Sequence, residues 1–411
     1  MNTTYNYHTF TNGMKLVHRQ VASVVAYAGV YIGVGSRNED ATQEGMTHFI
    51  EHTIFKGTQH RQAHHILNRI DGVGGELNAF TTKEETCLYT TSLIAHLPRC
   101  LDLLSDLVFF ATFPEKGLEK EKEVVIEEIN SYKDSPADSI FDEFEELAFE
   151  GSPLAHNILG TKRQVSHFSP EAVRTFFRNN YHPERMVLSV VADIPFERLV
   201  RLCRRLFETT GGGTPTPARD DRHEAIVWRP FDIVKHQRTH QHHLLMGTPA
   251  PSLYDDDKVA FTLINNLLGG PAMNSRLNVA VREKQGYCYS IESQYSPFAD
   301  TGIFYVYAGV DGDSVAQVRH IVCHELERLY HEPLSPRALR ASQQQLIAQM
   351  AINNDSGLNE MQSIGKAYLT YGHVDTLEDT NREISEITSE QIIDVARKYF
   401  KPDRISVLEY Q

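Results

Sequence analysis

The segment His48-Phe49-Ile50-Glu51-His52 carries the residue types of a metal-dependent hydrolase. His48 and His52 are four residues apart, so on a helix they share one face, because four residues cover slightly more than one 3.6-residue turn. Glu51 lies beside that face, within reach of a water held between the imidazoles. Two imidazoles and a carboxylate supply two zinc ligands and a base, and their order matches the inverted zinc-peptidase motif H-x-x-E-H. The alternative is a solvated helix face with two surface histidines.

A third ligand is expected from another element, because catalytic zinc usually takes three protein ligands and leaves one position to water. The best candidate is the glutamate-rich segment 115–130, which also has an apolar side. Within it Glu121 and Glu128 are seven residues apart, so on a helix they lie two turns apart on one face. That spacing offers one carboxylate as a ligand and a second to orient a ligand histidine. The alternative is an ordinary acidic helix facing solvent.

Several stretches around the motif extend it into a longer pattern. They are Gly35-Ser36-Arg37-Asn38-Glu39, Gly45-Met46-Thr47, Phe55-Lys56-Gly57-Thr58, Asn78-Ala79-Phe80-Thr81 with Glu84 and Thr86, and Val124-Val125-Ile126-Glu127-Glu128-Ile129. Together they resemble the pitrilysin/insulinase family of zinc peptidases, most closely its short mitochondrial-processing-peptidase branch.

The resemblance implies a set of roles around one zinc ion per chain. It makes His48, His52 and Glu128 the zinc ligands, Glu51 the general base and Glu121 a residue that supports a ligand. The Asn78–Phe80 stretch, comprising Asn78, Ala79 and Phe80, corresponds to an edge strand against which an extended peptide substrate adds.

The resemblance continues into the second half of the chain. Val281-Arg282-Glu283-Lys284 and Gly286-Tyr287-Cys288-Tyr289-Ser290 are similar to a C-terminal Arg/Tyr element of the family. It implies that Arg282 and Tyr289 contact substrate near the scissile bond. An arginine can hold a carbonyl and a tyrosine can donate to a developing oxyanion, so both residue types suit that role. Without the resemblance, a strand-end arginine and a packed tyrosine would be the simpler interpretation.

The two halves of the chain look related. Residues 169–188 and 388–407 align at an offset of 219, each reading as a capped amphipathic helix, an aromatic residue, x-Pro-acid-Arg and a strand. At that offset Glu128 corresponds to Ile347, and no second H-x-x-E-H occurs, so the second half is expected to bind substrate without metal. A Gly/Pro/Thr-rich tract marks a boundary. We therefore expect a catalytic domain over 1–208, a linker over 209–224 and a related domain over 225–411.

The predicted fold class is α+β, with two related domains that each contain a mainly antiparallel sheet. Doubly buried Val/Ile-rich strands are scarce, which favours half-exposed sheets covered by helices on one side. The ligand helix is expected over 42–55 with Thr42 as its N-cap, and a second helix over 97–109. Strands are expected over 24–34, 86–92, 186–191, 242–247, 287–294 and 302–310.

Composition narrows the functional classes. The net charge of −14 argues against a nucleic-acid partner. No apolar run reaches the length of about 18 residues that a membrane span needs. The N-terminus lacks a basic region followed by an apolar core, and the five cysteines form no C-x-x-C pair, so a cytoplasmic protein with reduced thiols is the simplest interpretation. A matured organelle protein would have the same features.

A second histidine group needs separate consideration. His240 and His242 would share one face of a strand, next to His243, and could bind a metal. No carboxylate accompanies them at strand spacing, so surface histidines are the preferred interpretation.

These observations lead to one functional hypothesis and one alternative. The chain is expected to be a zinc metalloendopeptidase that hydrolyses peptides or unfolded segments in a closed chamber, with Glu51 acting on a zinc-bound water. The resemblance implies a homodimer, or a heterodimer with a related subunit, because relatives enclose substrate between two domain pairs. The alternative is a noncatalytic assembly subunit of a processing or respiratory-type complex.

Overall fold

The structure is a computed structural model that describes residues 4–208, 226–237 and 239–411, and its chain forms two compact units. Unit 1 comprises Met1–Asn130, His156–Asp220 and Ala351–Thr376, and unit 2 comprises Ser131–Ala155, Asp221–Met350 and Leu377–Gln411. The units therefore interleave along the chain, whereas the sequence suggested one contiguous domain on either side of a linker. That predicted linker, residues 209–224, lies outside the described residues.

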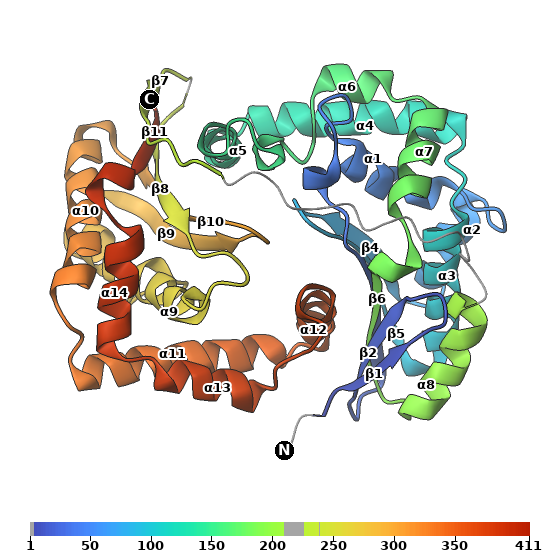
Figure 1. The fold of residues 1–411 in the computed structure, drawn as a ribbon. Coiled ribbons are helices and arrows are strands. Elements are labelled where there is room, and N and C mark those ends of the chain that lie inside the picture. Colours follow the sequence, from blue (N-terminus) through green and yellow to red (C-terminus); the bar gives the residue numbers. More distant parts are fainter. Residues whose placement is uncertain (1–3, 209–225, 238) are drawn as a thin grey trace. The chain divides into compact units, whose positions relative to one another are not determined.

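Unit 1 is built on a sheet with the strand order β1-β2-β6-β3-β5-β4 (Figure 1). Neighbouring strands are antiparallel except for β2 and β6, which pair in parallel. The strands are β1 (Asn6–Thr9), β2 (Lys15–Gln20), β3 (Val25–Ile32), β4 (Glu76–Thr81), β5 (Thr86–Leu93) and β6 (Met186–Ala192). Because β4 ends the order, its outer edge has no partner strand among the described residues.

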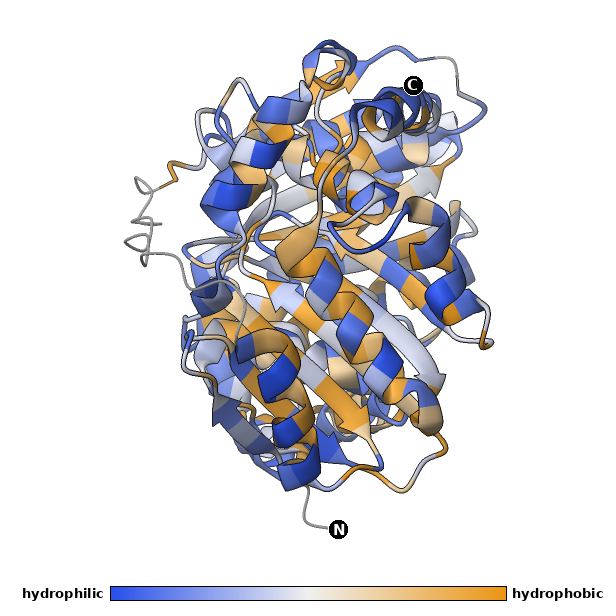
Figure 2. Ribbon diagram, turned by 90° about the vertical axis from the view of Figure 1, so that its right-hand side faces the viewer, coloured by the Kyte–Doolittle hydropathy of each residue, from blue (hydrophilic) through white to orange (hydrophobic). Residues whose placement is uncertain are grey.

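Helices from the first half of the chain cover one face of this sheet. Side chains such as Val30 and Leu188 point into a large apolar core with these helices, as the period-2 geometry of strands requires. Figure 2 shows the apolar and polar residues alternating along the helices. These helices are α1 (Met46–Thr53), α2 (Ala63–Asp71), α3 (Leu97–Phe110), α4 (Glu115–Lys133), α6 (Lys162–His167), α7 (Pro170–Asn180) and α8 (Phe196–Cys203).

The other face of the same sheet is covered by a helix from the second half of the chain, α12 (Gly357–Tyr371). Tyr31 and Val187, which alternate with the core residues of β3 and β6, pack with Met361 of α12. Gly365 lets the helix approach closely, since a Cβ there would lie 2.6 Å from Cδ2 of Tyr31. Ser189 Oγ also donates to the carbonyl oxygen of Met361 at 2.6 Å.

Unit 2 repeats this plan with a sheet of order β7-β11-β8-β10-β9. Its strands are β7 (Asp232–Lys235), β8 (His242–Ala250), β9 (Cys288–Pro297), β10 (Gly302–Val310) and β11 (Ser406–Tyr410). One face packs on helices of its own half, and the other receives α5 (Pro136–Ala148), whose Phe144 packs with Leu245 and Tyr305. The remaining helices are α9 (Lys258–Gly269), α10 (Val315–His331), α11 (Pro336–Asn354), α13 (Leu377–Glu386) and α14 (Ser389–Tyr399).

The repeat seen in the sequence is visible in the elements. Helices α7 and α14 begin 219 residues apart and have the same length. Each is capped by a hydroxyl: Ser169 accepts from the amide of Ala172, and Thr388 accepts from the amide of Gln391. The strands that follow, β6 and β11, each pair in parallel with one neighbour and antiparallel with the other. Each half of the chain also contributes one helix to the sheet of the other half. Helix α12 covers β3 and β6 in unit 1, and α5 covers the corresponding strands β8 and β11 in unit 2.

The predicted fold class, α+β with mainly antiparallel sheets, is confirmed. The expectation of half-exposed sheets is wrong for the inner strands: β6, β10 and β11 are buried along their whole length, whereas the edge strands β4 and β9 are partly exposed. The reason is that α12 and α5 cover the second face of each sheet, which the sequence pattern predicted to be exposed to solvent. Within the described residues, no helix is both long and apolar enough to cross a lipid bilayer.

Candidate metal centre

Helix α1 carries the motif and begins later than predicted. Its first residue is Met46 and its N-cap is Gly45 with φ +88°, so the prediction of Thr42 as N-cap is wrong. The cap is instead a distant carboxylate: Glu39 accepts from the amides of Gly45 at 2.8 Å and Thr47 at 2.7 Å. The buried Glu39 side chain thus satisfies amides that no local residue reaches.

His48, His52 and Glu128 converge, as the hypothesis requires. One ligand atom from each lies within 4.8 Å of the others, although the residues come from α1 and α4. Oε2 of Glu128 lies 3.7 Å from Nε2 of His48 and 3.4 Å from Nε2 of His52. This is the one such group of three or more His, Cys, Asp or Glu side chains in the described part of the chain.

The donor set fits a zinc ion. Two imidazole nitrogens and one carboxylate oxygen are ligands that zinc takes at catalytic sites. Oε2 of Glu128 is buried, and no described residue gives it a hydrogen bond. A buried carboxylate oxygen without a donor is unfavourable unless a cation or other group satisfies it.

Glu121 lies where it can support a ligand. Its Oε1 is 3.1 Å from Nδ1 of His52, and its Oε2 is 2.5 Å from Nζ of Lys56. A carboxylate on Nδ1 holds the imidazole so that Nε2 faces the metal position. Lys56 is part of the 55–58 stretch of the sequence pattern, but residue spacing assigns it no role, although it follows His52 by four residues.

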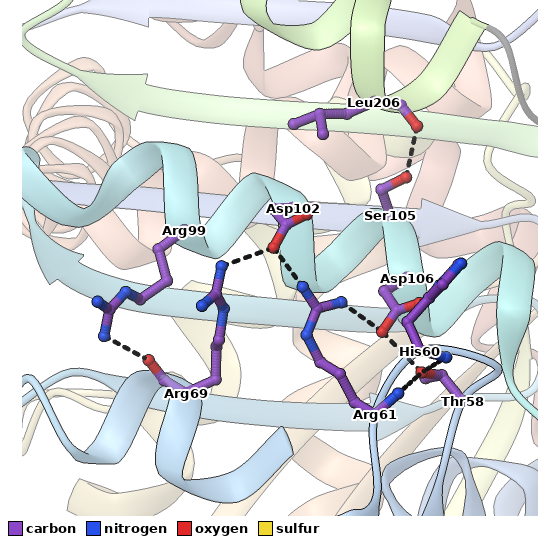
Figure 3. Close-up of polar contacts among 9 residues, drawn as sticks. All are labelled: Thr58, His60, Arg61, Arg69, Arg99, Asp102, Ser105, Asp106 and Leu206. Atoms are coloured by element: carbon purple, nitrogen blue, oxygen red, sulfur yellow. Dashed lines mark hydrogen bonds and ion pairs between the residues drawn. The ribbon is translucent and has the colours of Figure 1, made fainter. Parts of the chain in front are cut away.

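The segment after Lys56 is fixed to α3 by polar contacts, most of them to the buried Asp106 (Figure 3). Asp106, buried on α3, accepts from Thr58 Oγ1 at 2.7 Å and from Arg61 at 2.5 Å, and lies 2.6 Å from Nδ1 of His60. Asp102 accepts from the same Arg61 at 2.5 Å. These contacts hold the chain directly after α1, and with it Lys56, in a defined position.

Glu51 is held from a different element. Its Oε2 accepts from Oγ1 of Thr81, the last residue of β4, at 2.6 Å. Thr81 belongs to the 78–81 stretch of the sequence pattern, but residue spacing does not predict its contact with Glu51, because the contact depends on how α1 packs against β4.

Burial controls the charges of the group. Burial, with a smaller contribution from His52, lowers the pKa of His48 to about 3, so this imidazole is neutral and its lone pair is available to a metal. Burial raises the pKa of Glu51 above its ordinary value, against the hydrogen bond from Thr81. Burial also disfavours a charged His52, but the hydrogen bond to Glu121 and nearby carboxylates outweigh it and raise its pKa.

The other predicted site residues fall in two places. Asn78, Ala79 and Phe80 lie on β4, at the edge of the sheet of unit 1, where Oδ1 of Asn78 accepts from the amide of Ala79. Arg282 and Tyr289 lie together in unit 2, with the guanidinium carbon 5.7 Å from the centre of the tyrosine ring, which is 85% exposed. Their contact with substrate stays a prediction.

The second histidine group is not a metal site in the described residues. His242 does have a carboxylate neighbour, since its Nδ1 lies 2.9 Å from Oε1 of Glu409 on the adjacent strand β11. His243 instead contacts the hydroxyl of Tyr307 at 2.8 Å. Residue spacing along one strand could not predict this carboxylate, because Glu409 lies on a neighbouring strand, 167 residues away in the sequence.

Comparison with known proteins identifies the family of this chain. A model described as Insulinase (Peptidase family M16) matches residues 16–162, and one described as Peptidase M16 inactive domain matches residues 167–346. His48, His52 and Glu128 all fall within the first match. The same fold occurs in a protease from Helicobacter pylori (TM-score 0.93, 20% identity, 100% of this chain and 99% of that one). It also occurs in a Pseudomonas fluorescens protein named as a peptidase M16 inactive domain (TM-score 0.89, 18% identity, 99% and 97%).

Curated relatives are more similar in sequence. The uncharacterized zinc protease YmxG of Bacillus subtilis is 32% identical over 96% of both chains. An uncharacterized zinc protease of Streptomyces coelicolor is also 32% identical, over 95% of this chain and 86% of its own length. The resemblance found in the sequence is thereby confirmed, and the chain belongs to peptidase family M16, the insulinase family.

Proposed function

We propose that the chain is a zinc metalloendopeptidase that cleaves peptides or unfolded segments. The observation that carries this proposal is the convergence of His48, His52 and Glu128 beside the anchored carboxylate of Glu51. The relatives named as zinc proteases support the same chemistry.

His48, His52 and Glu128 would hold the zinc ion, one per chain. When bound, zinc acts as a Lewis acid towards a carbonyl and acidifies water. Glu51 accepts a proton from the attacking water and later gives a proton to the leaving amine.

The free edge of β4 is the proposed substrate site. An extended peptide can pair with Asn78, Ala79 and Phe80 through backbone hydrogen bonds, as an added strand. Such pairing reads the backbone more than the side chains, and it selects unfolded segments because a folded protein cannot offer an isolated strand. Arg282 and Tyr289 are proposed to contact the peptide near the bond that is cleaved.

The test is cleavage of unstructured peptides by the zinc-loaded protein, followed by mass spectrometry. Glu51→Gln should keep its zinc and lose roughly 10²- to 10⁴-fold in rate. Cleavage that persists in Glu51→Gln would refute Glu51 as base. A zinc-loaded parent protein without any cleavage would favour the noncatalytic assembly subunit instead.

We also propose that the working form is a homodimer, or a heterodimer with a related subunit. The molecular mass of the purified protein in solution tests the first option. A fully active monomer would contradict both.

A further inference from the structure

A hydrogen bond joins Thr81 of β4 to Glu51 of α1. At 2.6 Å, the contact from Oγ1 of Thr81 to Oε2 of Glu51 has the length typical of a hydroxyl bound to a carboxylate. Among the described residues, Thr81 provides the one hydrogen bond that Glu51 receives. The orientation of this carboxylate therefore depends on a single hydroxyl.

Two hydrogen bonds fix the turn between β4 and β5, which follows Thr81. The amide of Thr82 donates to the carbonyl oxygen of Glu85 at 2.8 Å, which closes the turn between β4 and β5. Nζ of the buried Lys83 donates to the carbonyl oxygen of His156 at 2.7 Å, which ties the turn to a distant segment of unit 1. Thr81 thus projects from a backbone that has little freedom to move.

Threonine suits the task of holding a carboxylate. Its β-branched side chain restricts the χ1 angle, so the hydroxyl has few alternative positions. A carboxylate can only accept, so the single hydroxyl proton of Thr81 points at Glu51. No described residue donates to Oε1 of Glu51, which leaves that oxygen available for proton transfer.

We propose that Thr81 is a positioning residue that holds Glu51 in the orientation needed to take a proton from the attacking water. This rests on the proposed function, in which Glu51 is the base. It also means that one rigid strand, β4, sets both the position of the peptide and the position of the base.

The experiment compares three substitutions in the full chain. Thr81→Val removes the hydroxyl but keeps the β-branch, and Thr81→Ser keeps the hydroxyl. Thr91→Val is the matched control, because Thr91 lies on the neighbouring strand β5 and its Oγ1 is buried without a described hydrogen-bond partner. The control therefore makes the same chemical change in the same sheet without removing a hydrogen bond.

For a zinc-loaded protein and an unstructured peptide, Thr81→Val should lower kcat roughly 10- to 100-fold. KM and zinc content should stay at parent values, Thr81→Ser should keep most of the kcat, and Thr91→Val should match the parent. A raised KM at unchanged kcat would overturn the proposal, because it would assign Thr81 to substrate binding.

A second measurement does not depend on activity. Crystal structures of the metal-free variants should show that the Glu51 carboxylate leaves its position in Thr81→Val and keeps it in Thr81→Ser and Thr91→Val. An unmoved Glu51 in Thr81→Val would overturn the positioning role. If the unmodified zinc-loaded chain cleaves no peptide, the proposed function fails, and the crystal structures still decide whether Thr81 positions Glu51.

Discussion

Oε1 of Glu121 lies 3.1 Å from Nδ1 of His52, while the other oxygen of the same carboxylate is bound to Lys56. The ion pair of Glu121 and Lys56 therefore holds His52 through Nδ1, the ring nitrogen that faces away from Glu128. The hydrogen bond from His52 and the neighbouring Lys56 lower the pKa of Glu121 despite its partial burial, so this carboxylate is ionised at neutral pH.

Replacing Glu121 with glutamine should weaken zinc binding roughly 10- to 100-fold, because carboxylates that support ligand histidines typically contribute that much. Competition with a chelator of known affinity measures this change. Glu123→Gln is the control, since Glu123 is exposed on the same helix. Equal zinc affinity in the two variants would contradict the supporting role of Glu121.

Replacing Glu128 with glutamine should remove most of the bound zinc after dialysis, because a neutral amide oxygen is a poorer ligand than a carboxylate. Metal analysis by mass spectrometry gives the zinc content per chain. Glu127→Gln provides the comparison and should keep its zinc, since Glu127 is exposed and contacts Asn130. A Glu128→Gln variant that still binds one zinc ion per chain would show that another residue is the third ligand, with Glu127 the first alternative.

Replacing Gly365 with alanine should destabilise unit 1 by about 1–3 kcal/mol, the usual cost of overpacking. The new Cβ would lie 2.6 Å from the ring of Tyr31, which is fully buried. Urea unfolding measures the change, with the exposed Ser363→Ala on the same helix as control. A more stable Gly365→Ala variant would show that helix propensity outweighs the clash.

His18 should make the protein sensitive to acid. Burial lowers the pKa of His18 to about 4 from an ordinary value of 6.5. As the pH falls from about 6.5 to about 4, the unfolded chain takes up a proton that the folded chain cannot, so stability is lost across this window. The loss is about 3 kcal/mol and is absent above it.

The pH effect can be isolated with His18→Leu. The free energy of unfolding of the variant, relative to the parent, should rise by about 3 kcal/mol between pH 6.5 and pH 4. Urea unfolding at several pH values measures the difference, with a substitution of the exposed His65 as control. A difference that stays constant with pH would rule out His18 as the source.

The local part of the site could be predicted from the sequence, and the tertiary part could not. His48 and His52 share one helix, so their spacing alone places them together. Glu128 needed the family resemblance, because 76 residues separate it from His52. Thr81 and Lys56 belong to the sequence pattern, but their contacts with Glu51 and Glu121 could not be predicted, because these contacts come from packing between elements. Spacing says nothing about such contacts.

The fold shows the same division. The range 302–310 agrees with β10 at both ends, since alternation along a strand is a local property. The covering of each sheet by a helix from the other half was missed, because an amphipathic pattern shows that a helix buries one face but not against which sheet. The start of α1 was missed for a related reason: Glu39, not the nearby Thr42, satisfies its amides.

The exchange of α5 and α12 has a consequence for how the gene can be divided. A fragment ending at residue 208 would lack α12 and display the apolar surface around Tyr31 and Val187 to water. The complementary fragment would lack α5 and display Leu245 and Tyr305 in the same way. We therefore expect each half to be unstable alone, and two coexpressed halves to stabilise each other.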